Sequence, residues 1–246
     1  MSTAVVTIIA AVVAAVTSFV CALLTIRGQR HTAREVANRA ADERAQALID
    51  RYQEPLLRAA YDLQSRLFNI LAQGLLSASH IKPEYIERST IWLLGQYFGW
   101  VEILRREAQF LKLPEMQDRA QVQALFDDIA RACSSDSKGG PRLQIQRSEQ
   151  RALGEVMVIR GRGVDGGERS DCLGYAAFCK EFENETSDIR RWFAPLGPQV
   201  WGHPGDTDDR LIYLQHALIA LIALIDTLDP DKIRFPVHRE RVLARH

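Results

Sequence analysis

The sequence predicts a mainly α-helical protein with a single N-terminal transmembrane helix, a polar helical stalk and a compact cytoplasmic helical bundle. The first supporting observation is an uncharged apolar run from Ser2 to Ile26. The second is the three- and four-residue spacing of apolar side chains after residue 54, and the third is the scarcity of alternating strand patterns. We expect four regions: an anchor at 1–28, a stalk at 29–53, a helical domain at 54–230 and a basic tail at 231–246.

The apolar run is long enough to cross a membrane. A transmembrane helix needs about 20 apolar residues, whereas a signal peptide has only about 7 to 15 behind a positive segment, which Met1 alone does not supply. The segment after the run is rich in arginine, with Arg27, Arg30 and Arg34 close to its end. The positive-inside rule therefore predicts a single-pass protein of the cell membrane, with the N-terminus outside and the domain in the cytoplasm.

Small residues recur along one face of the predicted span. Ala10, Ala14 and Ser18 are four residues apart, the spacing at which two membrane helices approach closely. This pattern suggests a homo-oligomer held together in the bilayer. The same spacing also arises by chance in an alanine-rich span, and this second interpretation is favoured.

The segment after the span has the composition of a solvated helix. Residues 30–53 are rich in Ala, Arg and Glu and contain neither Gly nor Pro. Their apolar positions, such as Val36, Ala40 and Ala47, are too few and too small for a convincing coiled-coil seam. A simple spacer is therefore favoured over a dimeric stalk.

Two prolines mark the start of the first two domain helices, because proline suits the first helical turn. Pro55 precedes apolar residues at helical spacing through Leu76, and Pro83 opens a second helix that runs to about Lys112. Both helices must bury an apolar face.

The second helix is apolar nearly all round between Ile91 and Leu104, which places it at the centre of the domain. Gly95 and Gly99 lie within this stretch, although glycine weakens a helix by up to about 1 kcal/mol relative to alanine. Close contact with a neighbouring helix would explain both glycines.

The rest of the domain is assigned from the same patterns, with Gly and Pro marking the loops. Val156–Ile159 fits a helix or a strand equally well. We expect helices over 115–133, 148–156, 171–182, 187–193 and 208–228, an extended segment at 143–145 and a loop over 195–207.

The last helix contains the apolar run Ala217–Ile225. Charged residues lie on both sides of this run. The uncharged apolar stretch is therefore much shorter than a transmembrane helix, which needs about 20 residues. We therefore expect a buried core helix rather than a second crossing.

Composition excludes several classes of function. Lys+Arg and Asp+Glu both total 31, so no global basic field exists to bind nucleic acid. The six histidines are scattered without metal-site spacing, and we predict neither a metal nor a cofactor. The cysteines beyond the span are expected to stay reduced in the cytoplasm and to pack in the core.

No motif for a catalytic nucleophile is present, so the catalytic residues are unknown and an enzyme is not favoured. Gly161, Gly163 and Gly166 have the spacing of a dinucleotide-binding loop. That loop requires repeated strand–helix units in a parallel sheet, whereas only one doubtful strand precedes these glycines. A surface loop is the favoured interpretation.

One group of polar residues is worth testing as a ligand site. Glu102 is the first charged residue of the apolar helix centre, where burial would raise its pKa as a general acid or base requires. The alternative, which is favoured, is that Glu102 pairs with Arg106 one turn away or with charges on the adjoining helix. The candidate ligand-binding residues are Asp62, Arg66, Gln96, Glu102, Arg105 and Arg106, with Asn69 in the same polar strip and Trp92, Tyr97, Trp100, Trp192 and Trp201 as candidate lining aromatics.

Four stretches carry a resemblance to a known group: EPLLRAAYDLQSRLFNIL, YFGWVEILRREAQFL, SEQRALGEVM and CLGYAAF. They resemble uncharacterised membrane-anchored helical proteins of high-GC actinobacteria over most of residues 50–230. The resemblance implies a bacterial cytoplasmic membrane. It implies no activity, cofactor or substrate.

These observations lead to two hypotheses on function. The first is a noncatalytic, membrane-tethered interaction or scaffold module that binds an unknown protein partner, or itself, at the cytoplasmic face. The second is a membrane-anchored enzyme or small-molecule sensor with a pocket around Glu102. An open pocket would favour the second.

Overall fold

The computed structural model describes residues 51–109, 117–136, 142–162, 168–203 and 207–228, together with Val36, Arg39, Ala40 and Val242. The predicted span, most of the stalk and nearly all of the basic tail lie outside these residues. Within them, no helix combines the length and the apolar character that a membrane crossing requires. The prediction of a mainly helical domain is confirmed, with one small sheet.

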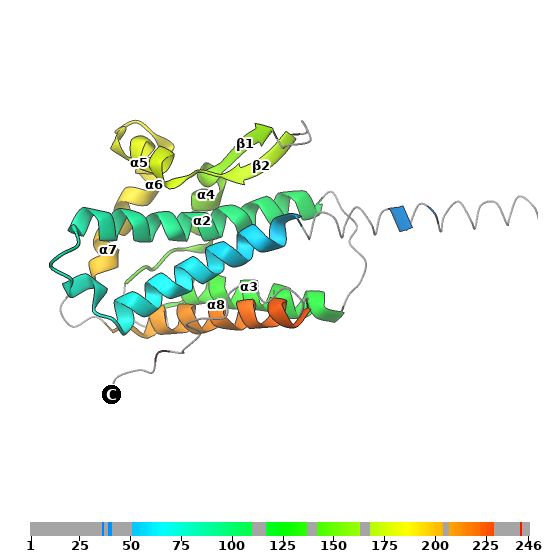
Figure 1. Cartoon of the computed structure of the whole chain (residues 1–246), viewed down its shortest axis with the longest axis horizontal. Helices are drawn as coiled ribbons and strands as arrows, with labels where there is room; N and C mark the ends of the chain where they lie inside the picture. The colour runs from blue at the N-terminus through cyan, green and yellow to red at the C-terminus, as the bar shows by residue number, and fades with distance from the viewer. Residues whose placement is uncertain are drawn as a thin grey trace, which may run out of the picture. The chain divides into compact units, whose positions relative to one another are not determined.

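The first helix of the domain covers residues 51–71. Figure 1 shows the elements that follow it. They are η1 (Leu75–Ser77), α2 (Pro83–Gln109), α3 (Gln117–Ser134), α4 (Arg147–Met157), β1 (Val158–Arg162), β2 (Glu168–Cys172), α5 (Tyr175–Glu183), α6 (Asp188–Phe193), η3 (Ala194–Leu196), α7 (Gly197–Trp201) and α8 (Asp209–Leu228).

The helix of residues 51–71 runs antiparallel to α2. At one end the Tyr52 and Trp100 rings lie 6.3 Å apart, and near the other the Arg66 guanidinium donates to Thr90 Oγ1 at 3.4 Å. Tyr52 is buried, although the predicted boundaries assign it to the stalk. Pro55 lies inside this helix rather than at its start, because residue 51 is already helical.

Three glycines allow the elements around α2 to approach its backbone. A Cβ atom at Gly154 of α4 would lie 2.6 Å from a backbone carbonyl oxygen of α2. Cβ atoms at Gly95 and Gly99 would come within 2.7 Å of Phe193 and 2.6 Å of the Cys172 sulfur, respectively. Real Cβ contacts are longer, since packed carbon atoms are about 3.5–4.0 Å apart. The predicted close packing at Gly95 and Gly99 is confirmed.

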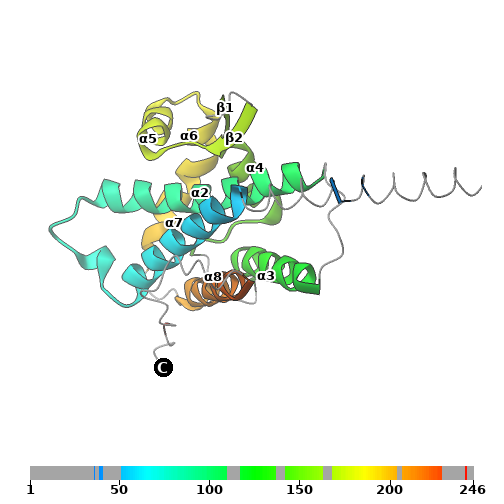
Figure 2. The ribbon, with the colours of Figure 1, turned by 45° about the vertical axis from the view of Figure 1, so that its right-hand side comes forward.

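A pair of helices, α3 and α8, packs together on the side away from α5, α6 and the hairpin (Figures 1 and 2). Leu214, Leu218 and Leu221 of α8 are fully buried. The apolar run of α8 therefore lies in the core, as the sequence predicts.

Arg210 joins the end of α3 to the start of α8. Its Nη1 atom donates to the carbonyl oxygens of Ala132 at 3.0 Å and Cys133 at 2.9 Å. The last carbonyls of a helix have no partner within the helix, so this fully buried guanidinium caps the end of α3.

The two strands form an antiparallel hairpin in which Val158 pairs with Cys172 and Arg162 with Glu168. The ambiguity at residues 156–159 is resolved because α4 ends at Met157 and β1 starts at the next residue. The prediction of a helix from Asp171 was wrong at its start, since pairing with β1 holds that residue in β2. An antiparallel hairpin also lacks the strand–helix units that dinucleotide binding requires.

Two other boundaries differ from the prediction. The expected loop over 195–207 contains η3 and α7, because Pro195 and Pro198 stand in the first turns of these helices, where proline is tolerated. Helix α4 starts at Arg147 with Gln146 rather than Ser148 at its N-cap, and the Glu149 carboxylate accepts a hydrogen bond from the Gln146 backbone N–H at 2.8 Å.

We predict that Gly154→Ala lowers the free energy of unfolding by about 1–3 kcal/mol, because the added methyl group meets a backbone oxygen that cannot turn aside. Chemical denaturation of the full-length protein measures the change. Gly161→Ala is the matched control, since its Cβ would meet only the Arg169 carbonyl oxygen at 4.0 Å. Equal stability of the two variants would contradict the close approach of α4 to α2.

Candidate ligand pocket

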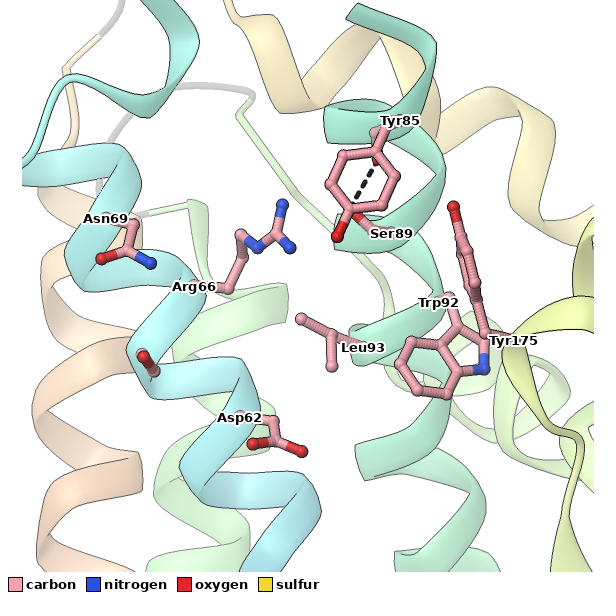
Figure 3. Close-up of a pocket in the computed structure, with 9 residues that line it drawn as sticks. Asp62, Arg66, Asn69, Tyr85, Ser89, Trp92, Leu93 and Tyr175 are labelled. Carbon is pink, nitrogen blue, oxygen red and sulfur yellow. Dashed lines mark hydrogen bonds between the residues drawn. The ribbon is translucent and has the colours of Figure 1, made fainter. Parts of the chain in front are cut away.

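A cavity of about 300 Å³ lies between the helix of residues 51–71 and α2, with one side chain from α5 at its edge. Figure 3 shows the side chains of both helices meeting across this space. The lining residues are Asp62, Ser65, Arg66, Asn69, Tyr85, Ser89, Trp92, Leu93 and Tyr175.

The helix of residues 51–71 supplies the polar wall. Asp62, Arg66 and Asn69 are spaced by four and three residues, which places them on one helix face (Figure 3). Among the described residues, the Asp62 carboxylate has no hydrogen bond or ion pair. Burial raises the pKa of this carboxyl, and the charge of Arg58 partly opposes that rise.

The positive charge of the pocket belongs to Arg66. Its side chain extends from the helix into the space between the two helices (Figure 3). One N–H group donates to Thr90 Oγ1 at 3.4 Å, which is a long hydrogen bond. A guanidinium has five N–H donors, so Arg66 keeps donors for a further acceptor.

Aromatic side chains form the opposite wall. The ring of Tyr175 lies 5.3 Å from that of Trp92 and 6.3 Å from that of Tyr85, with both pairs in edge-on arrangements. The Trp92 Nε1 atom donates to the Leu173 carbonyl oxygen at 3.1 Å, which fixes the indole. The buried Leu93 side chain adds apolar surface beside these rings.

Two hydroxyl groups of the pocket have defined states. Burial, together with a hydrogen bond to Cys179, raises the pKa of Tyr175 to about 12, so its phenol is protonated at neutral pH. Ser89 Oγ donates to the Tyr85 carbonyl oxygen at 2.5 Å, the contact drawn in Figure 3, so its proton is already used. Neither group is poised to act as a nucleophile.

Glu102 and its two arginines lie outside the pocket lining. The Glu102 carboxylate accepts from Arg105 Nε at 2.7 Å and from Arg106 Nε at 2.6 Å, while only 4% of its side chain is exposed. Burial alone would raise the pKa of this carboxyl, but the hydrogen bonds and charges of both arginines outweigh it and lower the pKa. Glu102 is therefore paired with its arginines, as the favoured interpretation has it. Its pKa is lowered, whereas a carboxyl that acts as a general acid needs a raised pKa.

Gln96 also lies outside the lining, and its Nε2 atom donates to the Leu173 carbonyl oxygen at 2.8 Å. The structure thus brings together only Asp62, Arg66 and Asn69 of the predicted polar strip, and adds Trp92 from the predicted aromatics. The other candidate aromatics, Tyr97, Trp100, Trp192 and Trp201, pack in or against the core.

The sequence analysis missed the remaining lining residues. On α2, Tyr85 and Ser89 precede the predicted Trp92 by seven and three residues, so a search for one helix face opposite Asp62 could have found them. Tyr175 comes from a segment more than 80 residues later, and no local pattern marks it. The part of the chain that the structure describes contains no group of three or more His, Cys, Asp or Glu side chains that could hold a metal ion.

Comparisons with known proteins add no assignment: no protein-family model matches this chain, and neither the curated proteins nor the solved structures include a match. The resemblance to actinobacterial membrane-anchored proteins therefore stays a prediction. The chemistry of the pocket is the remaining guide to function.

We predict that Glu102→Gln lowers the free energy of unfolding by about 1–3 kcal/mol at pH 7, because three charge-assisted hydrogen bonds to a buried group are weakened. A carboxyl with a lowered pKa stabilises the fold above its unfolded pKa of about 4.3, and this contribution is lost as the pH falls through the folded pKa. The difference between the variant and the native protein should therefore shrink towards pH 3 in chemical denaturation.

The control for this prediction is Asp128→Asn, which removes an exposed ion pair with Arg131. Exposed pairs contribute about 0–1 kcal/mol, so the control should change stability little at any pH. A native-like stability of Glu102→Gln at pH 7 would show that the carboxylate is not a structural partner of its arginines.

Proposed function

We propose that this chain is a membrane-tethered helical module that binds a small molecule in the pocket between the helix of residues 51–71 and α2. The observation that carries the proposal is that Asp62, which has no hydrogen bond or ion pair among the described residues, and the Arg66 guanidinium face three aromatic rings across about 300 Å³. Ligand sites are mainly apolar cavities with a few convergent polar groups, and this volume lies at the lower end of their usual range.

A packing defect would have a different lining. Voids in protein cores are apolar, because a buried polar group without a partner costs free energy. Here Asp62 has its pKa raised by burial and has no hydrogen-bond partner among the described residues. A carboxyl with a perturbed pKa that lines a cavity is a candidate for a binding site.

The lining supports binding more than catalysis. Asp62 is the only carboxyl among the described lining residues, and burial raises the pKa of the Tyr175 phenol to about 12. No cysteine or histidine lines the cavity, and neither serine has a basic partner at hydrogen-bond distance among the described residues. We therefore favour a sensor or carrier over an enzyme.

The membrane part of the proposal rests on the sequence alone. Ser2–Ile26 would span the cell membrane, and the arginines that follow would hold the domain at its cytoplasmic face. The resemblance to actinobacterial proteins agrees with a bacterial membrane. A ligand bound in the pocket would then be a cytoplasmic molecule.

An interaction or scaffold module remains the second candidate, and one observation favours it. Tyr85 borders the pocket and is 49% exposed, so the rim offers an aromatic surface to a partner protein. A partner side chain could enter the same pocket. Detergent-solubilised protein that is strictly monomeric and carries no copurifying partner would contradict this candidate and the homo-oligomer predicted from the span.

The test of pocket binding is a thermal-shift screen of the full-length protein in detergent micelles, with aromatic amines, aromatic acids and aromatic amino acids as probes. We expect at least one of these classes to raise the melting temperature, because a ligand at 100 times its Kd stabilises the folded state by about 2.7 kcal/mol. Ser65→Trp should abolish the shift by filling the cavity from the helix of residues 51–71.

Ser79→Trp is the matched control, since Ser79 is exposed and does not line the cavity. The control should respond to the probes as the native protein does. If no class of probe shifts the native protein, or if Ser65→Trp responds unchanged, the pocket is not a ligand site.

Alkaline carbonate extraction tests the tether. We predict that the full-length protein stays in the membrane pellet, while a variant lacking residues 2–26 moves to the supernatant, because the apolar run alone would hold the chain in lipid. Release of the full-length protein would contradict the membrane proposal without affecting the pocket.

A further inference from the structure

We infer that the pocket recognises a small zwitterion, namely an α-amino acid whose side chain is aromatic or otherwise flat and apolar. This inference rests on the proposed function, because it names the ligand class of the same pocket. The juxtaposition that carries it is one negative and one positive side chain on one wall, with aromatic faces on the other (Figure 3).

The two charges are placed for a ligand that carries both signs. Asp62 and Arg66 are four residues apart on one helix, so their Cβ atoms are about 5–6 Å apart. No ion pair between them is present among the described residues, although that spacing would allow one. An ammonium group at Asp62 and a carboxylate at Arg66 would each gain a charge-assisted hydrogen bond.

A ligand with a single charge fits this wall less well. An amine without an acid group would approach Asp62 but leave the guanidinium of Arg66 beside it, and a simple acid would meet the carboxylate of Asp62. A buried polar group left without its partner costs free energy, and a charged one costs more. The pocket therefore discriminates against both kinds of molecule.

The opposite wall selects the body of the ligand. The indole N–H of Trp92 is already bound to the Leu173 carbonyl oxygen, so the ring presents only its faces and edges. Tyr175 packs edge-on against that ring, and Leu93 lies beside it. Flat apolar groups stack well on such surfaces.

The size of the cavity limits the ligand further. A volume of about 300 Å³ equals that of roughly ten water molecules at about 30 Å³ each. This space suits a molecule of about a dozen non-hydrogen atoms. A nucleotide or a lipid chain would extend beyond this volume, whereas phenylalanine fits within it.

The experiment compares four compounds on the native full-length protein in detergent micelles by isothermal titration. They are L-phenylalanine, phenethylamine, which lacks the carboxylate, 3-phenylpropionate, which lacks the amine, and O-phosphoethanolamine, a zwitterion without the aromatic body. We expect L-phenylalanine to bind, and each of the other three to bind about tenfold or more weakly, because each loses a charged or stacked contact.

Two substitutions assign the charges. Asp62→Asn should remove the preference for L-phenylalanine over 3-phenylpropionate, because the amine then has no carboxylate to meet. Arg66→Gln should remove the preference for L-phenylalanine over phenethylamine. Asp128→Asn, an exposed acid on α3, is the control and should keep both preferences. Melting curves of the free variants establish that each is folded, and the compound series on the native protein does not depend on them.

The outcomes separate this inference from the proposed function. If phenethylamine, 3-phenylpropionate or O-phosphoethanolamine binds as tightly as L-phenylalanine, or if no aromatic amino acid binds while an aromatic amine or an aromatic acid does, the zwitterion inference is overturned and the pocket stands. If no probe of any class binds, the proposed function itself is overturned.

Discussion

The close approach of neighbouring elements to α2 is the constraint on which the rest of the domain depends. Gly154 of α4 rests on the α2 backbone, and Gly95 and Gly99 admit Phe193 and Cys172 to the same helix. One side of α2 is thereby filled by α4, α6 and the hairpin, which leaves its other side to the helix of residues 51–71. These contacts fix the position of α2. The position of α2 in turn sets where the helix of residues 51–71 packs and how far apart the two walls of the pocket lie.

Two carboxylates of the domain, Glu102 and Asp62, have contrasting surroundings. Glu102, in the C-terminal third of α2, is paired with Arg105 and Arg106, so its carboxylate stabilises the fold. Asp62 is left without such partners among the described residues, although Arg66 lies one turn away. Sequence alone does not separate the two carboxylates, because each has an arginine at helical spacing. Only the geometry shows which one is already paired.

Much of the helical architecture could be predicted from periodicity, as for α2 and α8, and the paired glycines of α2 indicated a tight contact before any partner was known. The hairpin could not be predicted with the same security. Its strands are five residues each, and Asp171 becomes extended only because β1 lies beside it. For the pocket, the polar face of the first helix was visible in the spacing of Asp62 and Arg66. Tyr175 was not, since it reaches the site through tertiary packing.

The contacts of Arg210 affect the order in which the parts of this domain can fold during synthesis. Its guanidinium closes α3 through carbonyl groups that precede it by 77 and 78 residues, and the leucines that follow it complete the core. Contacts over such sequence separation form slowly, because the intervening chain must first lose its freedom. A nascent chain that emerges as far as α7 therefore has an uncapped helix end and an unfilled interior. Premature stop codons before α8 would yield a substrate for proteases rather than a shortened, working protein.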